Sequence, residues 1–299
     1  MASLFYKETP VQEIKNDLLE RARVRLLIKR EDLNHPFVSG NKWWKLKYNL
    51  EEAVRLKHDT LLTFGGAYSN HIFATAAAAF EMDLKSIGII RGEETLPLNR
   101  TLTFVKEKGM RLHYVSREDY RRKAEDDFME NLRKRFGDFY FIPEGGTNAL
   151  AVKGCEEFAK KILTEIEFDY LCLPVGTGGT MAGIVAGFGG EKEVIGFPVL
   201  KGGAFLEGKI MRLLKNDSIE AFKNWKINAD YHFGGYGKKT KELRDFISTQ
   251  WHNHHLPLDQ VYGSKMMFGI YDVVKKGNFK KGSTILALHT GGLQGNNYF

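Results

Sequence analysis

The sequence is poor in cysteine and contains no long hydrophobic run. Among its 299 residues only Cys155 and Cys172 are cysteines, and their spacing is not that of a metal site. We interpret both as buried free thiols and expect no bound metal. No apolar segment approaches the roughly 20 residues of a membrane span, and residues 1–15 lack the apolar core of a signal peptide. The sequence therefore predicts a cytoplasmic protein without a membrane partner.

Acidic residues are outnumbered, which gives a formal net charge of +7 and an isoelectric point near 9.1. A basic protein can bind nucleic acid. Here the basic residues are scattered among acidic ones, and the clusters at 121–123 and 133–135 are typical of solvated helix faces. A mild positive bias suits a small anionic ligand equally well. We expect no nucleic-acid partner, because the sequence contains no motif for one.

Apolar segments of strand length alternate with segments of helical periodicity along the chain. We predict strands at residues 24–30, 60–64, 85–90, 111–115, 140–142, 169–174, 194–199, 225–230 and 283–289. We predict helices that start near residue 42 and at residues 73–82, 100–108, 126–136, 149–163, 181–188, 206–214, 239–252 and 265–275. Such alternation is typical of parallel sheets covered by helices on both faces, which predicts an α/β fold. No repeat period is visible, so a repeat fold is not expected.

Five Gly-Gly pairs follow or end the predicted strands, at residues 65–66, 145–146, 178–179, 234–235 and 291–292. In open parallel sheets, ligands bind beyond the carboxyl ends of the strands. Glycine allows the backbone to approach a ligand closely. One pair would be an ordinary turn, but five pairs, most of them beside Ser, Thr, Asn or Tyr, predict a ligand surrounded by loops.

The run Gly176-Thr177-Gly178-Gly179-Thr180 joins a predicted strand to a predicted helix. Consecutive backbone N–H groups and the helix dipole would point at one spot there, which predicts an anion site with two threonine hydroxyls. The run is neither a dinucleotide fingerprint nor a P-loop. A tight strand-to-helix turn without a ligand is the alternative.

Lys42 follows Gly40-Asn41 and opens an amphipathic segment, so we place it in the first turn of a helix. The positive field of a helix N-terminus disfavours the ammonium form, as does burial. A neutral amine can attack a carbonyl group. Lysines at helix starts are also commonly solvated, and this motif alone leaves that alternative open.

Ser69-Asn70-His71 lies at another predicted helix start and offers a hydroxyl, an amide and an imidazole within one turn. Such donors suit a carboxylate, and simple N-capping by Ser69 or Asn70 is the alternative. A phosphate site, a helix-start lysine and a carboxylate site together describe pyridoxal phosphate (PLP) holding an amino acid.

Five motifs of the sequence resemble those of a known family. The shared motifs are Gly-Asn-Lys at Lys42, Gly-Gly-x-x-Ser-Asn-His, Gly-Thr-Gly-Gly-Thr, Val261-Tyr262-Gly-Ser-Lys265 and His289-Thr290-Gly-Gly-Leu293. In this order they resemble the 1-aminocyclopropane-1-carboxylate deaminase / D-cysteine desulfhydrase family of fold type II PLP enzymes. The resemblance runs from about Lys29 to Leu293. It implies two domains, each with an open, mostly parallel twisted sheet flanked by helices.

The resemblance also implies roles for single residues. Lys42 would form the covalent imine with PLP, with Lys45 and Lys47 as the other candidates nearby. Asn70 would lie at the phenolic oxygen of PLP, and Ser69 and His71 at the substrate carboxylate. The phosphate would lie at Gly176, Thr177, Gly178, Gly179 and Thr180. Tyr236 and Tyr262 match the two active-site tyrosines of the family, and Thr290 matches the residue beside the pyridine nitrogen. Packed core tyrosines and a strand-end cap are the alternatives.

Two positions bear on the substrate. Family members that open the cyclopropane ring have Glu after the second tyrosine and Leu in the His-x-Gly-Gly motif, where this chain has Gly263 and Thr290. Desulfhydrase-like members have a small hydroxyl residue and Thr. The chain matches them at Thr290 and matches neither group at Gly263. We expect β-elimination from D-cysteine, with cyclopropane deamination or non-catalytic binding of an amino acid as alternatives.

The resemblance sets the expected organisation as well. Residues 1–48 and 150–299 would form the larger, PLP-binding domain, and residues 49–149 the smaller one. The partner would be a small amino-acid substrate, and the protein would be a homodimer, as is usual for the family.

Overall fold

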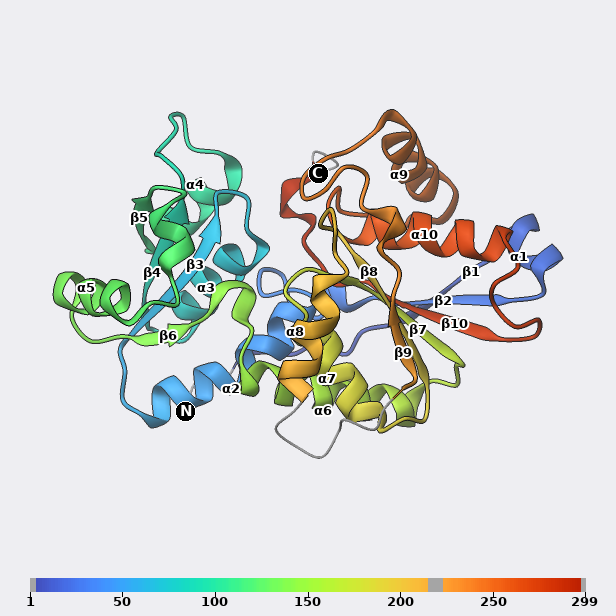
Figure 1. Cartoon of the computed structure of the whole chain (residues 1–299), viewed down its shortest axis with the longest axis horizontal. Coiled ribbons are helices and arrows are strands. Elements are labelled where there is room, and N and C mark those ends of the chain that lie inside the picture. Colours follow the sequence, from blue (N-terminus) through green and yellow to red (C-terminus); the bar gives the residue numbers. More distant parts are fainter. Residues whose placement is uncertain (1–3, 215–222, 297–299) are drawn as a thin grey trace.

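The computed structural model describes residues 4–214 and 223–296, which form two mainly parallel β-sheets flanked by helices (Figure 1). A six-stranded sheet has the order β1-β2-β10-β7-β8-β9, and a four-stranded sheet has the order β5-β4-β3-β6. The predicted α/β fold with two helix-flanked sheets is therefore confirmed.

The six-stranded sheet consists of β1 (Val11–Ile14), β2 (Arg25–Lys29), β7 (Tyr170–Val175), β8 (Glu193–Pro198), β9 (Trp225–Ile227) and β10 (Thr284–Leu288). Its strands are parallel except for β1, which pairs antiparallel with β2. Successive residues of β7 enter different hydrophobic cores: Leu171 and Leu173 pack in one, and Cys172 packs in the other. Both faces of the sheet are covered, which is why its central strands are apolar throughout.

The four-stranded sheet consists of β3 (Thr60–Gly66), β4 (Lys85–Arg91), β5 (Arg111–Val115) and β6 (Tyr140–Ile142), all parallel. Their carboxyl ends therefore meet at one edge. Each sheet takes its strands from only one of the two predicted domains. The domain limits themselves, 1–48 with 150–299 and 49–149, stay a prediction.

Ten α-helices surround the sheets in the described residues. They are α1 (Asp17–Ala22), α2 (Asn41–Arg55), α3 (Asn70–Glu81), α4 (Arg100–Glu107), α5 (Asp126–Phe136), α6 (Ala149–Glu165), α7 (Gly179–Phe188), α8 (Phe205–Leu214), α9 (Lys241–His254) and α10 (Gly263–Lys275). Helix α2 packs closely on α6, because a Cβ atom on Gly154 would lie only 2.0 Å from the carbonyl oxygen of Trp44. No helix among these residues is long and apolar enough to cross a membrane.

The predicted elements occur in the structure with small shifts of their ends. Strand β9 ends at Ile227, earlier than predicted, because a 3-10 turn (Ala229–Tyr231) follows it. Strand β1 and helix α1 were not predicted. Both are short, and β1 is the one antiparallel strand of the described sheets.

Candidate active site

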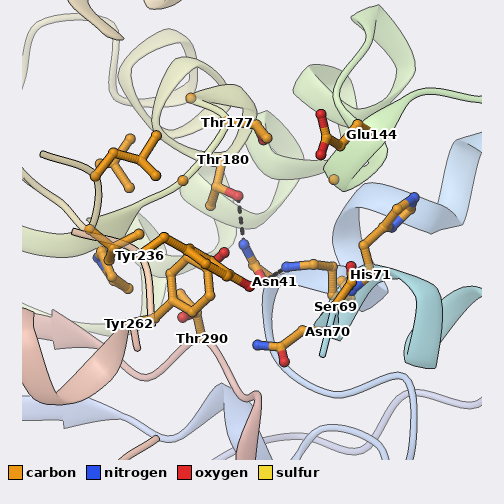
Figure 2. Close-up of a pocket in the computed structure, with 18 of the residues that line it drawn as sticks. Asn41, Ser69, Asn70, His71, Glu144, Thr177, Thr180, Tyr236, Tyr262 and Thr290 are labelled. Carbon is orange, nitrogen blue, oxygen red and sulfur yellow. Dashed lines mark hydrogen bonds between the residues drawn. The ribbon is translucent and has the colours of Figure 1, made fainter. Parts of the chain in front are cut away.

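A cavity of about 380 Å³ lies between the two sheets. Its size is that of a small-molecule pocket, for which about 300–1,000 Å³ is typical. The four-stranded sheet contributes residues at or after the ends of β3, β4 and β6, and the six-stranded sheet contributes residues at or after the ends of β7, β8 and β10. Most of the predicted site residues line it: Lys42, Ser69, Asn70, His71, Gly176, Thr177, Gly178, Thr180, Tyr236, Tyr262 and Thr290. Ten of the lining residues are labelled in Figure 2.

The start of α2 lies directly against the end of β10. Gly40 caps this helix with φ +68°, and a Cβ atom there would lie 2.0 Å from the carbonyl oxygen of Thr290. Only glycine accepts both the conformation and the close approach. The first turn of α2, with Lys42, and Thr290 therefore enter the same pocket.

A chain of hydrogen bonds connects Lys42 with the glycine-rich loop. The Nζ atom of Lys42 donates to Oδ1 of Asn41 at 2.8 Å, and Nδ2 of Asn41 donates to Oγ1 of Thr180 at 2.8 Å (Figure 2). Burial lowers the pKa of Lys42 to about 8, so the neutral fraction near neutral pH is larger than for a solvated lysine and grows as the pH rises. The amine therefore lies close to the predicted anion site and loses its proton more readily than a solvated lysine does.

Lys45 occupies the same pocket and is held in place more firmly. Its Nζ atom donates to the carbonyl oxygen of Gly145, to Oγ1 of Thr147 at 2.8 Å and to Oγ1 of Thr177 at 3.4 Å. Burial, and then the charge of Lys42, lower the pKa of Lys45 to about 7. The geometry separates the two amines: Lys45 is fixed by acceptors from two loops, whereas Lys42 has only its neighbour Asn41 within the described residues.

Lys47, the third lysine considered from the sequence, points elsewhere. Its Nζ atom is 2.7 Å from both carboxylate oxygens of Glu157 on α6, and it does not line the cavity. This ion pair removes Lys47 from the candidates for cofactor attachment.

The glycine-rich loop joins β7 to α7. Gly178 caps α7 with φ 90° and has no side chain to satisfy the first N–H groups of the helix. A Cβ atom on Gly179 would lie 2.9 Å from Cγ2 of Thr147, so the loop is closely packed from behind. The free N–H groups, the helix dipole and the Lys45 amine beside Thr177 form a site for a phosphate-sized anion, and a bound anion would favour the charged form of Lys45.

Ser69 is the N-cap of α3, as the capping alternative predicted. Its Oγ atom accepts from the N–H groups of His71 at 3.2 Å and Ile72 at 3.3 Å, and its own proton stays available. Asn70 faces the loop after β10, since a Cβ atom on Gly292 would lie 2.2 Å from its Nδ2 atom. Its Oδ1 atom accepts from Gln294.

His71 differs from the expected imidazole donor. Its Nε2 atom bonds Oγ1 of Thr63 at 2.8 Å and its Nδ1 atom lies 3.5 Å from Oγ1 of Thr75. Burial, reinforced by the charges of Lys45 and Lys42, lowers the pKa of His71 well below its usual range. The ring is thus a neutral part of the pocket wall, and both nitrogens already have partners.

Tyr236 and Tyr262 form an edge-on pair with ring centroids 6.0 Å apart. Burial raises the pKa of both hydroxyls, so both are protonated donors at neutral pH. Tyr262 is placed by the buried Asp259, whose carboxylate accepts the N–H groups of Val261 at 2.8 Å and of Tyr262 at 2.7 Å. The sequence analysis did not identify Asp259, and its position three residues before Tyr262 was the available signal.

Thr290 is held at the end of β10 by its neighbour His289. The Nε2 atom of His289 lies 2.6 Å from the carbonyl oxygen of Pro257, and the N–H of Gly291 donates to Nδ1 at 3.2 Å. These bonds fix the backbone on both sides of Thr290. A neutral hydroxyl therefore projects at the point where the last strand meets the pocket.

The chain is similar to known pyridoxal-phosphate dependent enzymes. A model of the pyridoxal-phosphate dependent enzymes matches residues 2–291. The mitochondrial bifunctional D-cysteine desulfhydrase/1-aminocyclopropane-1-carboxylate deaminase of Arabidopsis thaliana is 32% identical over 293 residues, which cover 90% of this chain and 73% of that protein. The 1-aminocyclopropane-1-carboxylate deaminase of Bradyrhizobium sp. strain BTAi1 is 27% identical over 297 residues, which cover 90% and 87% of the two chains.

A solved structure agrees with these relatives. The crystal structure of an ACC deaminase homologue matches with a TM-score of 0.85 and 29% identity, and the match covers 98% of this chain and 92% of the other. The motifs around Lys42, Ser69, Thr180, Tyr262 and Thr290 meet in one pocket on the same fold. The chain belongs to the pyridoxal-phosphate-dependent enzymes, in the 1-aminocyclopropane-1-carboxylate deaminase and D-cysteine desulfhydrase family.

Proposed function

We propose that Lys42 is the residue that binds PLP covalently and that residues 176–180 hold its phosphate. The observation that carries this proposal is the hydrogen-bond chain from the Lys42 amine through Asn41 to Thr180, at the start of α7. Lys45 would add the positive charge for the phosphate. Asn70 would contact the phenolic oxygen, and Thr290 the pyridine nitrogen, as the family resemblance implies.

We propose that the reaction is α,β-elimination from a small amino acid such as D-cysteine, which gives pyruvate, ammonia and sulfide. Two residues support this choice over ring opening. Thr290 is neutral, and Gly263 contributes no carboxylate of its own. A carboxylate at position 263 would help to keep the pyridine nitrogen protonated. Ring opening is the harder reaction and depends more on that protonation than β-elimination does.

The chemistry that PLP supplies when bound is electron withdrawal from the α-carbon of the attached amino acid, which makes the Cα–H bond acidic. The Lys42 amine, in its neutral form, accepts that proton. Ser69 and the N–H groups near it hold the substrate carboxylate. The protonated hydroxyls of Tyr236 and Tyr262 donate hydrogen bonds to the departing sulfur, because both phenols keep their protons at neutral pH.

A second candidate is deamination of the cyclopropane amino acid to 2-oxobutanoate, the activity in the names of both relatives. One observation favours it: the buried Asp259 carboxylate lies next to Gly263, since a Cβ atom on Gly263 would be 3.1 Å from its Oδ1 atom. Tyr262 would then be the acid–base group at the ring.

Product assays separate the two reactions. The purified enzyme is incubated with D-cysteine, L-cysteine, β-chloro-D-alanine and 1-aminocyclopropane-1-carboxylate, and pyruvate and 2-oxobutanoate are measured. We expect pyruvate from D-cysteine and β-chloro-D-alanine. Turnover of the cyclopropane compound alone would reverse the ranking. Lack of turnover by a yellow, PLP-loaded protein would instead support a non-catalytic amino-acid-binding protein.

We further propose that the protein is a cytoplasmic homodimer. Family resemblance supports the dimer. The Arabidopsis relative is mitochondrial, so fractionation of the source cells is the relevant test of location. Light scattering on the holoenzyme tests the dimer.

A further inference from the structure

Three charged side chains that line the cavity have no role in the reaction described above: Lys209 on α8, and Arg91 and Glu144 on the side of the four-stranded sheet. Arg91 is the last residue of β4, and Glu144 follows β6. Both line the cavity. In the order β5-β4-β3-β6, strands β4 and β6 flank β3, and β3 leads into the turn with Ser69. Because all four strands are parallel, Arg91 and Glu144 lie on either side of the proposed carboxylate site.

The two charges are not equivalent, because only one of them is compensated. Glu144 accepts a hydrogen bond from the Tyr120 hydroxyl at 2.7 Å, and its other oxygen lies 3.4 Å from the Lys123 amine. Arg91 packs over the ring of Tyr120 at 5.6 Å from its centroid. The Arg91 side chain is exposed and, within residues 4–214 and 223–296, forms no hydrogen bond or ion pair. The Arg91 guanidinium therefore brings to the pocket a positive charge that has no ion-pair partner among the described residues.

Arg91 and Glu144 also lie within electrostatic reach of Tyr236. Figure 2 shows Glu144 on the opposite side of the pocket from Tyr236 and Tyr262. The charges of Arg91 and Glu144 both reach Tyr236, where burial has the largest effect in raising the pKa. A substrate held at Ser69 would thus have its side chain between the two tyrosines and the guanidinium.

We infer that Arg91 selects substrates whose β-substituent ends in an anionic group such as a carboxylate. The inference rests on the proposed function for the position of the substrate. Guanidinium is suited to this task, because it offers several N–H donors in a plane that matches a carboxylate. The Arg91 guanidinium lies over the ring of Tyr120, and the Tyr120 hydroxyl is held by Glu144.

A cysteine that carries a carboxymethyl group on sulfur has the required shape. In its elimination the Cα proton passes to the Lys42 amine, and the Cβ–S bond breaks with its electron pair on sulfur. The sulfur leaves as mercaptoacetate, and the three-carbon fragment takes up one water to give pyruvate and ammonia. The balance needs no oxidant or reductant.

The test compares S-carboxymethylcysteine with S-carbamoylmethylcysteine, which has nearly the same shape and no negative charge. Calorimetric titration of the PLP-loaded enzyme with both D- and L-forms measures affinity without requiring turnover. We expect the carboxymethyl compound to bind about tenfold or more tightly, as a charge-assisted hydrogen bond provides. In R91Q this ratio should fall to about one, and R91K should keep part of it.

Arg111→Gln is the matched control, because Arg111 starts the neighbouring strand β5 and does not line the cavity. It should keep the wild-type ratio. Equal binding of the two compounds by the wild type overturns the inference. Equal loss of both compounds in R91Q also overturns it, because Arg91 would then bind the α-carboxylate. Failure of D-cysteine turnover would count against the proposed reaction and leave this comparison of affinities intact.

Discussion

The Nζ atom of Lys265 lies 2.8 Å from the carbonyl oxygen of Gly235, the residue directly before Tyr236. The same amine donates to the carbonyl oxygen of His232 at 2.9 Å, and the side chain is fully buried on α10. Residues 233–235 all have positive φ, which for Phe233 is an unfavourable conformation. Lys265 therefore holds in place the loop that carries Tyr236 to the pocket.

Lys265→Met should lower kcat/KM by about tenfold, since a charge-assisted hydrogen bond is worth about 1.5–3 kcal/mol. The replacement keeps the length of the side chain and removes both donated bonds. If Lys265 acts by placing Tyr236, the double variant with Tyr236→Phe should lose no more than the larger of the single losses. Additive losses would show that Lys265 has another role. Lys275→Met, at the exposed end of the same helix, is the control.

Lys42→Ala should abolish the visible absorbance of the PLP-loaded protein and the peptide label left by borohydride reduction. Lys45→Ala should keep the label on Lys42 and weaken cofactor affinity by about tenfold or more, because one charge-assisted contact to an anion is lost. Absorbance titration and peptide mapping measure both effects. A borohydride label on Lys45 in the wild type would reverse these assignments.

Covalent capture of PLP by the cofactor-free protein should become faster as the pH rises, with a midpoint near 8. The neutral amine is the nucleophile, and burial lowers the pKa of Lys42 to about 8. A solvated lysine would give a midpoint near about 10.4. Stopped-flow absorbance measures the rate. A midpoint near that of free lysine would contradict the buried position of the amine.

The free energy of unfolding of the cofactor-free protein should rise with pH between about 7 and about 10.5. The pKa of Lys45 is lowered to about 7, so over this range the unfolded chain binds more protons than the folded one. Stability is therefore lowest at the acidic end of the window, where the buried ammonium must form. Lys45→Met should weaken the dependence without removing it, because burial also lowers the pKa of Lys42 and of Lys265 to about 8. Denaturant titrations at a series of pH values measure the change.

Gly263→Ala should destabilise the protein by about 1 kcal/mol, as overpacking of a filled site does. The new Cβ atom would lie 3.1 Å from Oδ1 of Asp259, and the N–H groups that bind this carboxylate prevent it from moving. Gly208→Ala in α8 is the contrasting variant, because nothing lies within 4 Å of its new Cβ atom. Its melting temperature should rise through the better helix propensity of alanine. Equal shifts in both variants would contradict this account.

Much of the fold could be predicted because local signals and global packing agree. Leu171, Cys172 and Leu173 are all apolar since β7 is buried on both faces, and such runs identify a central strand from sequence alone. Strand β1 has only four residues and leaves Val11 exposed, so its apolar pattern is too short to read.

The candidate site was predictable where a motif carries its own chemistry, as with Lys42 and the loop at 176–180. Lys45 was noticed only as a neighbour of Lys42, because its acceptors Gly145, Thr147 and Thr177 are at least 100 residues away. The engagement of His71 by Thr63 has the same cause, since a bond across a strand-to-helix turn depends on the tertiary fold. Partners that are distant in sequence leave no local pattern.

The Lys45 amine donates to the carbonyl oxygen of Gly145, in a loop of the smaller sheet, and to the hydroxyl of Thr177, in a loop of the larger sheet. These hydrogen bonds connect the two loops. Binding of PLP should therefore affect the contact between these two loops as well as the catalytic centre. Amide hydrogens of residues 143–148, remote from the attached aldehyde carbon, should exchange more slowly once the phosphate is bound. In the cofactor-free protein Lys45 would connect the two loops without help from the phosphate, so these amide hydrogens should exchange faster there.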